Sequence, residues 1–514
     1  MSAKPSYYIT TPIYYVNDIP HIGHAYTTLA CDVLARFKRL DGFEVLFLTG
    51  TDEHGQKVEK SAAAAGKTPK EFCDIVSQRF RDLAEVMKFS NDDFIRTTED
   101  RHKRACQALW NKLLDNGHIY LDKYAGWYSV RDEAFFGENE LVENKENIKV
   151  APTGAPVEWV EEESYFFKLS NFEEKLLSFY ENLPATVLPN TRKNEVKSFV
   201  EGGLRDLSIS RTSFNWGVPV PDNDKHIMYV WIDALTNYIT AAGYPDVGSE
   251  KFKNFWPADI HMVGKDILRF HAVYWPAFLM GAGLEPSNRI FAHGWWTSDG
   301  QKISKSLGNV IDPFGLVDEF GLDQVRYFLM REVSFGKDGD FNRQSMINRI
   351  NSDLANDLGN LAQRSLSMIY KNCDGAIPCP DALSLDDKTL LDMVDCLLVY
   401  VRDCIDKQAI NKYLELIWKV VSAANIYFTA QEPWALKVTD PARMATVLYV
   451  TAEAIRQISI LTQPIMPDSA AKLLNTLNIP INERGFEYLG GVHRITSKNS
   501  IEKPQGVFPR FIET

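Results

Sequence analysis

Apolar and polar positions over the first fifty residues follow a pattern that predicts a strand, a helix and a second strand. Residues 6–11 (SYYITT) and 44–48 (EVLFL) are apolar runs of strand length. Between them, apolar residues recur every three or four positions over 22–40, and Asp-Gly at 41–42 closes this predicted helix. A strand, a helix and a strand in this order favour a βαβ unit with a parallel sheet.

The α/β pattern stops and then returns. Short alternating segments with aromatic and acidic residues run from 116 to 224 and look like an insertion. Strands are predicted at 227–232 (IMYVWI), 260–264 (IHMVG) and 289–296 (RIFAHGWW), a helix at 266–281, and a Ser/Gly/Lys loop at 297–309. After residue 323 the pattern is almost wholly helical. The expected division is a first catalytic half at 1–115, a connective insertion at 116–224, a second catalytic half at 225–322, a linker at 323–365 and a helical domain at 366–514.

Composition and charge limit the class of protein, the compartment and the kinds of partner that we expect for this chain. Its 514 residues include 45% hydrophobic and 24% charged ones, which is ordinary for a multidomain globular protein. The N-terminus lacks the order of a signal peptide, and no apolar run is long enough to predict a membrane span, so we expect a cytoplasmic protein with no membrane partner. A net charge of −12 argues against broad binding to polyanions, although a local basic surface could still bind RNA.

Two short motifs suggest phosphate chemistry. HIGH, at 21–24, lies at the predicted helix start, where Gly23 lets a ligand approach and the imidazoles and helix N-terminus can face phosphate oxygens. KISKS, at 302–306, places two lysines on a small-residue loop suited to clamping a polyphosphate. Alone, the first is also compatible with a turn carrying two solvated histidines, and the second with a solvated basic turn.

Taken together and in order, these motifs resemble the class I aminoacyl-tRNA synthetases. The blocks TPIYYVNDIPHIGHAYT, LTGTDEHGQK, YVWIDALTNYI, VGKDILRFHAVYWPAFLM and HGWWTSDGQKISKSLGNVIDP are similar to those of the methionyl-tRNA synthetase family. With the helical C-terminal part, the resemblance covers essentially the whole chain. It implies a Rossmann-like parallel-sheet catalytic domain split by a connective insertion, followed by an α-helical bundle that binds the anticodon.

The resemblance also implies a two-step reaction. L-Methionine and ATP, with Mg²⁺ sharing the phosphate charge, give methionyl-adenylate and pyrophosphate, and methionyl is then transferred to the terminal ribose 2′-OH of tRNA(Met), including the initiator. The implied catalytic residues are His21, His24, Asp52, Lys302 and Lys305. The implied ATP-binding residues are His21, Gly23, His24, Gly264, Asp266, Lys302 and Lys305.

The amino-acid and anticodon sites follow from the same resemblance. Asp52 matches the carboxylate that takes the substrate ammonium, and an apolar and aromatic set suits the polarizable thioether sulfur. The implied methionine-binding residues are Ile13, Tyr15, Asp52, Trp231, Ala234, Leu235, Tyr238, Ile267, Phe270, His271 and Trp275. The implied anticodon readers are Asn360, Arg364 and Trp434, since single-stranded bases are read by stacking and by hydrogen bonds to their edges.

The chain departs from many of these relatives in one domain. Its seven cysteines form no CxxC pair and none falls in 116–224, so a four-cysteine zinc site cannot form there and no zinc is expected. After PQGVFPRFIET there is no added β-barrel module of the kind that makes some relatives dimers, so we expect a monomer.

Three other functions fit part of the sequence. Synthetases for leucine, isoleucine or valine share the two motifs but carry a larger editing insertion. Small nucleotidyltransferases also use HxGH but would not need the long helical part. A non-catalytic tRNA-binding protein would have no use for intact HIGH and KISKS.

Overall fold

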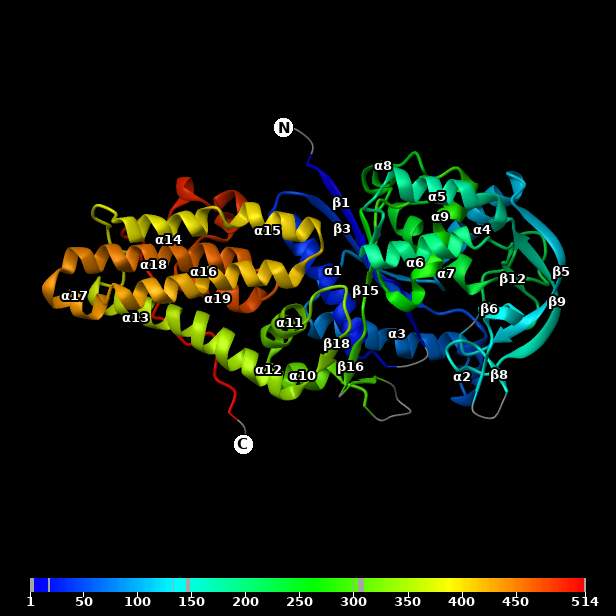
Figure 1. Cartoon of the computed structure of the whole chain (residues 1–514), viewed down its shortest axis with the longest axis horizontal. Helices are drawn as coiled ribbons and strands as arrows, with labels where there is room; N and C mark the ends of the chain where they lie inside the picture. The colour runs from blue at the N-terminus through cyan, green and yellow to red at the C-terminus, as the bar shows by residue number, and fades with distance from the viewer. Residues whose placement is uncertain are drawn as a thin grey trace.

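The computed structural model describes residues 4–16, 19–132, 134–144, 148–298, 300–303 and 309–512. The molecule is elongated, with an α/β part at one end and a helical bundle at the other (Figure 1). Helix α1 and strands β1 and β3 lie where the two parts meet. The N-terminal strand is therefore next to both parts.

A seven-stranded sheet forms the centre of the α/β part within the described residues, and its recorded pairings are all parallel. The strand order is β10-β15-β14-β1-β3-β2, with β4 also paired to β3. The strands are β1 (Ser6–Thr10), β2 (Tyr14–Tyr15), β3 (Glu44–Asp52), β4 (Asp93–Arg96), β10 (Val187–Leu188), β14 (Ile260–Gly264) and β15 (Ile290–His293). Because β1 lies between β3 and β14, the chain order reverses around it, and ligands of such sheets bind beyond the carboxyl ends of the strands at this point.

Helices cover both faces of the sheet. Successive residues of β1 point to opposite faces of the sheet, as strand geometry requires. Tyr7 and Ile9 belong to one buried apolar cluster, and Tyr8 belongs to another. Helix α1 (Ile22–Leu40) packs with the first cluster, and α4 (Asp100–Asp115), α7 (Val230–Ala242) and α9 (Trp275–Ala282) pack with the second. The remaining helices of this part are α2 (Gln56–Ala64), α3 (Pro69–Val86) and α8 (Glu250–Phe255).

The predicted elements over 6–11, 22–40 and 260–264 are confirmed, but two predicted strands are wrong in part. The run 227–232 is a strand only at β13 (Ile227–Met228), and from Val230 it is helix α7. Helix α7 is buried on nearly every side, and an apolar run of that kind has the same pattern as a buried strand.

The second wrong strand is 289–296. It breaks after β15, and β16 (Trp296–Ser298) joins a different sheet with β17 (Gln301–Lys302) and β18 (Gly339–Phe341). At the break, a Cβ on Gly294 would lie 2.3 Å from the Lys337 carbonyl carbon, so only glycine fits.

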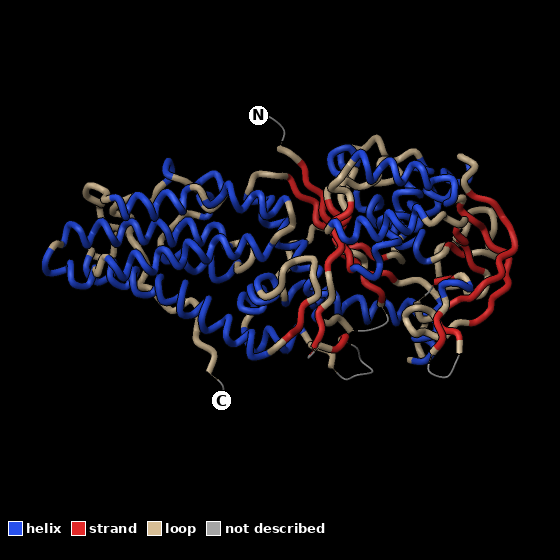
Figure 2. The backbone as a smooth tube through the Cα atoms, viewed as in Figure 1, coloured by secondary structure: helices blue, strands red, loops and turns tan. Residues whose placement is uncertain are grey.

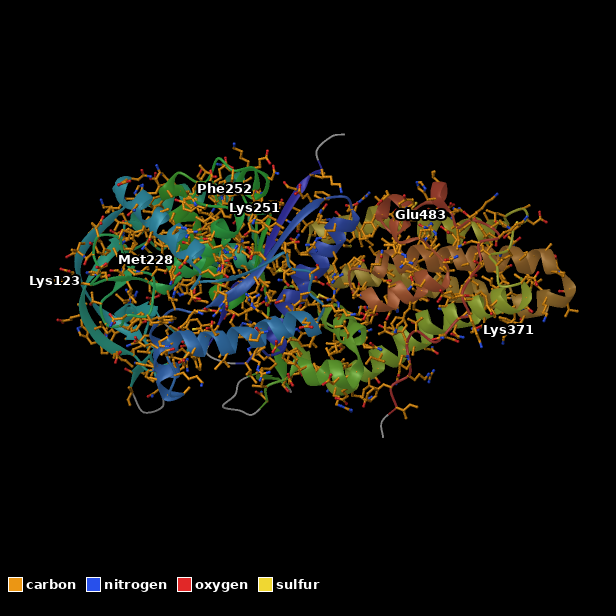
Figure 3. The ribbon with its side chains drawn as sticks, turned by 180° about the vertical axis from the view of Figure 1, so that it is seen from behind. Lys123, Met228, Lys251, Phe252, Lys371 and Glu483 are labelled. Carbon is orange, nitrogen blue, oxygen red and sulfur yellow. The ribbon has the colours of Figure 1, made fainter. Side chains whose placement is uncertain are left out.

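The insertion forms its own antiparallel sheet of order β11-β9-β5-β6, at the edge of the molecule far from the bundle (Figure 1). Its elements are β5 (Ile119–Ser129), β6 (Ala134–Phe136), β7 (Val142–Glu143), β8 (Lys149–Val150), β9 (Glu158–Phe167), α5 (Glu173–Asn182), α6 (Asn190–Glu201), β11 (Leu207–Ser208) and β12 (Ser210–Arg211). Figure 3 shows Lys123 of β5 on this outer edge. Strand β10, although inside the expected range of the insertion, pairs with the catalytic sheet through β15.

Helices make up nearly all of the rest (Figure 2). They are α10 (Pro313–Phe320), α11 (Leu322–Arg331), α12 (Arg343–Arg349), α13 (Asn360–Asn372), α14 (Leu385–Asp395), α15 (Leu397–Asp406), α16 (Ile410–Ala430), α17 (Pro433–Thr439), α18 (Pro441–Thr462) and α19 (Pro467–Thr476). A π-helix (Ile350–Gly359) joins α12 to α13 without a break, so the domain boundary expected between 365 and 366 falls inside α13.

Helix α18 is long and apolar enough to cross a bilayer by length and composition, but 94% of its most apolar window is buried inside the protein, so it is the central helix of the bundle. The bundle packs on α1, where the Phe37 ring lies 4.7 Å from that of Phe486 and 5.8 Å from that of Tyr413.

Candidate active site and tRNA interface

A cavity of about 1480 Å³ opens at the carboxyl ends of the parallel strands. It is lined by Asp52, Gly264 and His293, the last residues of β3, β14 and β15, and by Pro12, which lies just beyond β1. We call it the substrate cavity. It lies where the strand order reverses, which is where ligands of parallel sheets of this kind bind.

The two histidines of HIGH cap helix α1. His21 is the N-cap, and its Nδ1 accepts the Gly23 N–H at 3.1 Å, while His24 Nδ1 accepts the His21 N–H at 3.1 Å. The two rings lie 3.9 Å apart, and both line the substrate cavity together with Gly23. A Cβ on Gly23 would lie 2.9 Å from the His21 ring, so this close packing needs glycine.

This arrangement corrects one expectation, that the helix N-terminus itself faces a ligand. The first-turn amides of α1 are already bonded: Ile22 N–H donates to the Ile311 carbonyl, Gly23 N–H to His21 Nδ1, and His24 N–H to the His21 carbonyl. Since each Nδ1 accepts, each neutral ring carries its proton on Nε2. The histidine Nε2–H groups, and not the helix amides, are therefore the donors of this motif.

Burial, and then the neighbouring His21, hold the pKa of His24 well below its ordinary value. The His24 ring is neutral at pH 7 and can contact phosphate as a hydrogen-bond donor.

Asp52 is the last residue of β3 and is 7% exposed at the cavity. Its backbone is fixed on one side, because Asp52 pairs with Tyr15 of β2 and its carbonyl accepts the Val16 N–H.

The cavity is also lined by Arg211, which the sequence analysis did not name. This guanidinium is 1% exposed, lies 4.4 Å over the Tyr229 ring and donates to Ser208 Oγ. A lone arginine in an irregular insertion has no pattern that would single it out.

The apolar and aromatic residues expected to bind methionine come together from three segments. Ile13, Tyr15, Trp231, Ala234, Leu235, Tyr238, Ile267, Phe270 and His271 line the cavity. The Trp231 and Phe270 rings are stacked 3.6 Å apart. Trp275 is fully buried behind this surface, with its ring 6.1 Å from that of Tyr238, and does not line the cavity.

One hydrogen-bond chain fixes the tautomer of His271. Its Nδ1 is 2.9 Å from the Ile267 carbonyl oxygen, which only accepts, so Nδ1 carries the proton. Nε2 then accepts the Tyr238 hydroxyl at 2.7 Å. Burial lowers the pKa of His271 to about 4, so the ring is neutral at pH 7.

The segment after β14 forms another side of the cavity. Gly264 and Asp266 both line it, and a Cβ on Gly264 would lie 2.6 Å from Asp266 Oδ1. Trp295, a second residue missed by the sequence analysis, donates its indole N–H to Asp266 Oδ1 at 3.1 Å and lines the cavity.

The KISKS motif begins on a strand. Lys302 lies on β17, paired with Thr297 of β16, and Ile303 lines the cavity. Lys305 lies outside the described residues. The β16–β17 pair therefore brings the start of the motif to the cavity.

The expected anticodon readers are carried by α13 and α17, which lie in the helical bundle at the end of the molecule opposite the insertion (Figure 1). Asn360 and Arg364 lie one turn apart on α13, and the Arg364 guanidinium is 5.1 Å from the Phe428 ring and 5.5 Å from the Trp434 ring. Trp434, on α17, is 45% exposed. An exposed indole held by a guanidinium is suited to stacking on an unpaired base.

Comparisons with known proteins agree with this geometry. Residues 7–366 match a family model described as tRNA synthetases class I (M), and residues 377–513 match one described as the anticodon binding domain of methionyl tRNA ligase. The chain belongs to the class I methionyl-tRNA synthetase family.

Its relatives in this family match over the full length. Methionine–tRNA ligase of Brucella suis is 56% identical over 512 residues, covering 99% of each chain, and that of Rickettsia conorii is 57% identical over 98% of this chain and 99% of its own. The structure of Mycobacterium tuberculosis methionyl-tRNA synthetase in complex with methionyl-adenylate has a TM-score of 0.96 at 53% identity, covering 99% of this chain and 100% of that one.

Proposed function

We propose that this chain is a methionine–tRNA ligase that activates L-methionine with ATP and transfers it to tRNA(Met). The observation that carries the proposal is the substrate cavity, where HIGH, Asp52 and an apolar aromatic surface meet at the carboxyl edge of the sheet. The family match over both the catalytic and the helical parts supports it.

In the first step, a methionine carboxylate oxygen attacks the α-phosphorus of ATP. The new O–P bond forms as the bond to the β-phosphate oxygen breaks, giving methionyl-adenylate and pyrophosphate. Asp52 binds the substrate ammonium, and the surface around Trp231 and Tyr238 holds the thioether. This binding fixes the carboxylate in line with the reacting phosphorus, so positioning supplies much of the rate.

The protein acts on the phosphates through hydrogen-bond donors and cations. The rings of His21 and His24 donate Nε2–H, and Lys302 and Lys305 contact the charge that develops on the leaving pyrophosphate. Asp266 accepts the ribose hydroxyls, and Gly264 leaves room for the nucleotide beside it. Mg²⁺ arrives with ATP and shares the phosphate charge.

In the second step, the 2′-oxygen of the terminal ribose attacks the carbonyl carbon of the adenylate, and AMP leaves as that hydroxyl loses its proton. Asn360, Arg364 and Trp434 select tRNA(Met), initiator included, by its anticodon. We propose that the enzyme acts as a monomer in the cytoplasm and needs no zinc, since residues 116–224 contain no cysteine.

The test is amino-acid-dependent ATP–pyrophosphate exchange, run with each of the twenty amino acids, with and without tRNA. Exchange with methionine alone supports the proposal, and exchange strongest with leucine, isoleucine or valine would assign another class I specificity. Aminoacylation of tRNA(Met) tests the second step. Pyrophosphate exchange without aminoacylation would favour a nucleotidyltransferase. The absence of both activities would favour a non-catalytic tRNA-binding protein.

A further inference from the structure

Behind the substrate cavity, a buried carboxylate joins two histidines from different elements. Asp233, in the first turn of α7, accepts His54 Nδ1–H through Oδ2 at 2.6 Å and His102 Nε2–H through Oδ1 at 2.7 Å. His54 follows β3, and His102 lies on α4. All three side chains are at most 3% exposed, and none lines the substrate cavity. We call these three residues the positioning cluster.

The positioning cluster has side chains of the kinds that bind metals, but the distances between their nitrogen and oxygen atoms are those of hydrogen bonds. Among the described residues, His102, Cys106 and Asp233 are the one group whose potential ligand atoms gather this closely. The His102 nitrogen and Asp233 oxygen are 2.7 Å apart, whereas ligands about 2.0 Å from a tetrahedral zinc lie about 3.3 Å from each other. Burial also raises the pKa of the Cys106 thiol well above its ordinary value, which disfavours the thiolate that binds metals.

The charge on Asp233 makes these hydrogen bonds directional. Burial alone would raise the pKa of Asp233, but the facing His54 and His102 hold it below its ordinary value. The carboxylate is therefore ionised and only accepts, so each imidazole must turn an N–H toward it. Two charge-assisted bonds between buried side chains thus join the segment after β3, α4 and α7.

The cluster connects two sides of the substrate cavity. His54 is two residues from Asp52, which is proposed to bind the ammonium, and Asp233 immediately precedes Ala234 of the apolar surface. Trp216 also holds the segment around His54. Its indole N–H donates to the Glu53 carbonyl at 2.5 Å, and its backbone carbonyl accepts the Gly55 N–H. The His54–Asp233 bond directly links the segment that follows β3 to α7.

We propose that Asp233 is a positioning residue for amino-acid binding: through His54 and His102 it sets the spacing between Asp52 and the apolar surface of α7, without touching the substrate. The inference rests on the proposed function, because methionine is the amino acid that spans this distance. A ligand bound at both ends loses affinity when the two ends shift relative to each other.

The experiment compares Asp233→Asn with the parent in methionine-dependent pyrophosphate exchange. An amide presents an N–H where a carboxylate oxygen accepted one, so it cannot accept from both imidazoles. We expect the KM for methionine to rise about tenfold or more, and the KM for ATP to stay within about threefold. Asp387→Asn is the matched control. It removes a buried carboxylate that holds Arg443 and Tyr427 in the helical bundle, so it should lower the melting temperature and leave both KM values unchanged.

A pair of variants at His54 makes the test independent of Asp233→Asn folding. His54→Ala loses the donor and should raise the KM for methionine as Asp233→Asn does. In His54→Asn the amide nitrogen takes about the position of Nδ1, so the KM should stay within about threefold of the parent. The double variant His54→Ala/Asp233→Asn should be no worse than the poorer single variant.

Several results would overturn the inference. These are an unchanged methionine KM in folded Asp233→Asn or in His54→Ala, an equal rise in both KM values, or no rescue by His54→Asn. A parent protein that exchanges with another amino acid, or with none, would instead refute the proposed function, which separates the two failures.

Discussion

The Arg326 guanidinium donates to the Asp32 carboxylate at 2.6 Å, and both side chains are fully buried where the helical bundle meets the catalytic part. Asp32 belongs to α1 and Arg326 to α11. The same guanidinium also donates to the backbone carbonyls of Met87, Pro464 and Ile465. One side chain therefore bonds α1, the segment after α3 and the turn between α18 and α19.

Removing this guanidinium should destabilise the protein strongly. Among the described residues, Arg326→Met leaves the buried Asp32 carboxylate with Arg36 as its one remaining ion-pair partner, and breaking a buried ion pair costs about 3–5 kcal/mol. Arg402→Met is the matched control, because Arg402 of the bundle pairs with Asp41, the residue after α1, but its side chain is 47% exposed, so its loss should cost about 1 kcal/mol or less. Urea unfolding measures both, and equal losses would contradict this account.

Lys305→Ala should lower the rate of adenylate formation by about a hundredfold or more, since a group that contacts charge developing in the transition state acts on kcat. Methionine binding should be nearly unchanged. Rapid-quench activation kinetics measure the rate. The control is Lys371→Ala, an exposed lysine of α13 in the bundle (Figure 3), which should activate methionine like the parent. A parent-like rate in Lys305→Ala would rule out the clamp.

Asp52→Ala should cripple activation, because loss of one partner of a partly buried charge pair costs about 2–5 kcal/mol. The value of kcat/KM for methionine in pyrophosphate exchange measures this loss. If it stays within a few-fold of the parent, the ammonium is bound elsewhere.

His271 should make stability depend on pH. Its pKa of about 4 in the folded protein is below its ordinary value of about 6.5, so below pH 6.5 the unfolded chain binds a proton that the folded chain does not. This stability is present above pH 6.5 and is lost progressively as pH falls toward 4, by up to about 3 kcal/mol. His271→Asn should show a shallower decline in urea unfolding over this range. Parallel curves for variant and parent would refute the shift.

Trp434→Ala should reduce aminoacylation kcat/KM by about tenfold to a hundredfold, the value of one base–aromatic stack of about 1–3 kcal/mol. Pyrophosphate exchange should be unaffected, because it needs no tRNA. Trp434→Phe keeps a stacking ring and should lose less. Equal losses in both assays would mean that Trp434 is structural, and unaltered discrimination against a tRNA with a changed anticodon would also contradict the assignment.

The sequence by itself determined those helices and strands that are marked by patterns among neighbouring residues. The bounds of α1 and β14 follow from the spacing of apolar residues and from turn residues, and the ordered motifs identified the family. These features lie within a few residues of each other in the chain. They can therefore be read without knowing where the rest of the protein lies.

Only the tertiary structure decided which distant groups meet. From Val230 onward the chain forms a helix where the sequence predicted a strand, because an apolar run buried on all sides suits a helix as well as a strand. The tertiary structure also brought His54 and His102 to Asp233, which lies 179 and 131 residues away from them in the chain. Nothing local marks such partners, because their bonds depend on how whole elements pack.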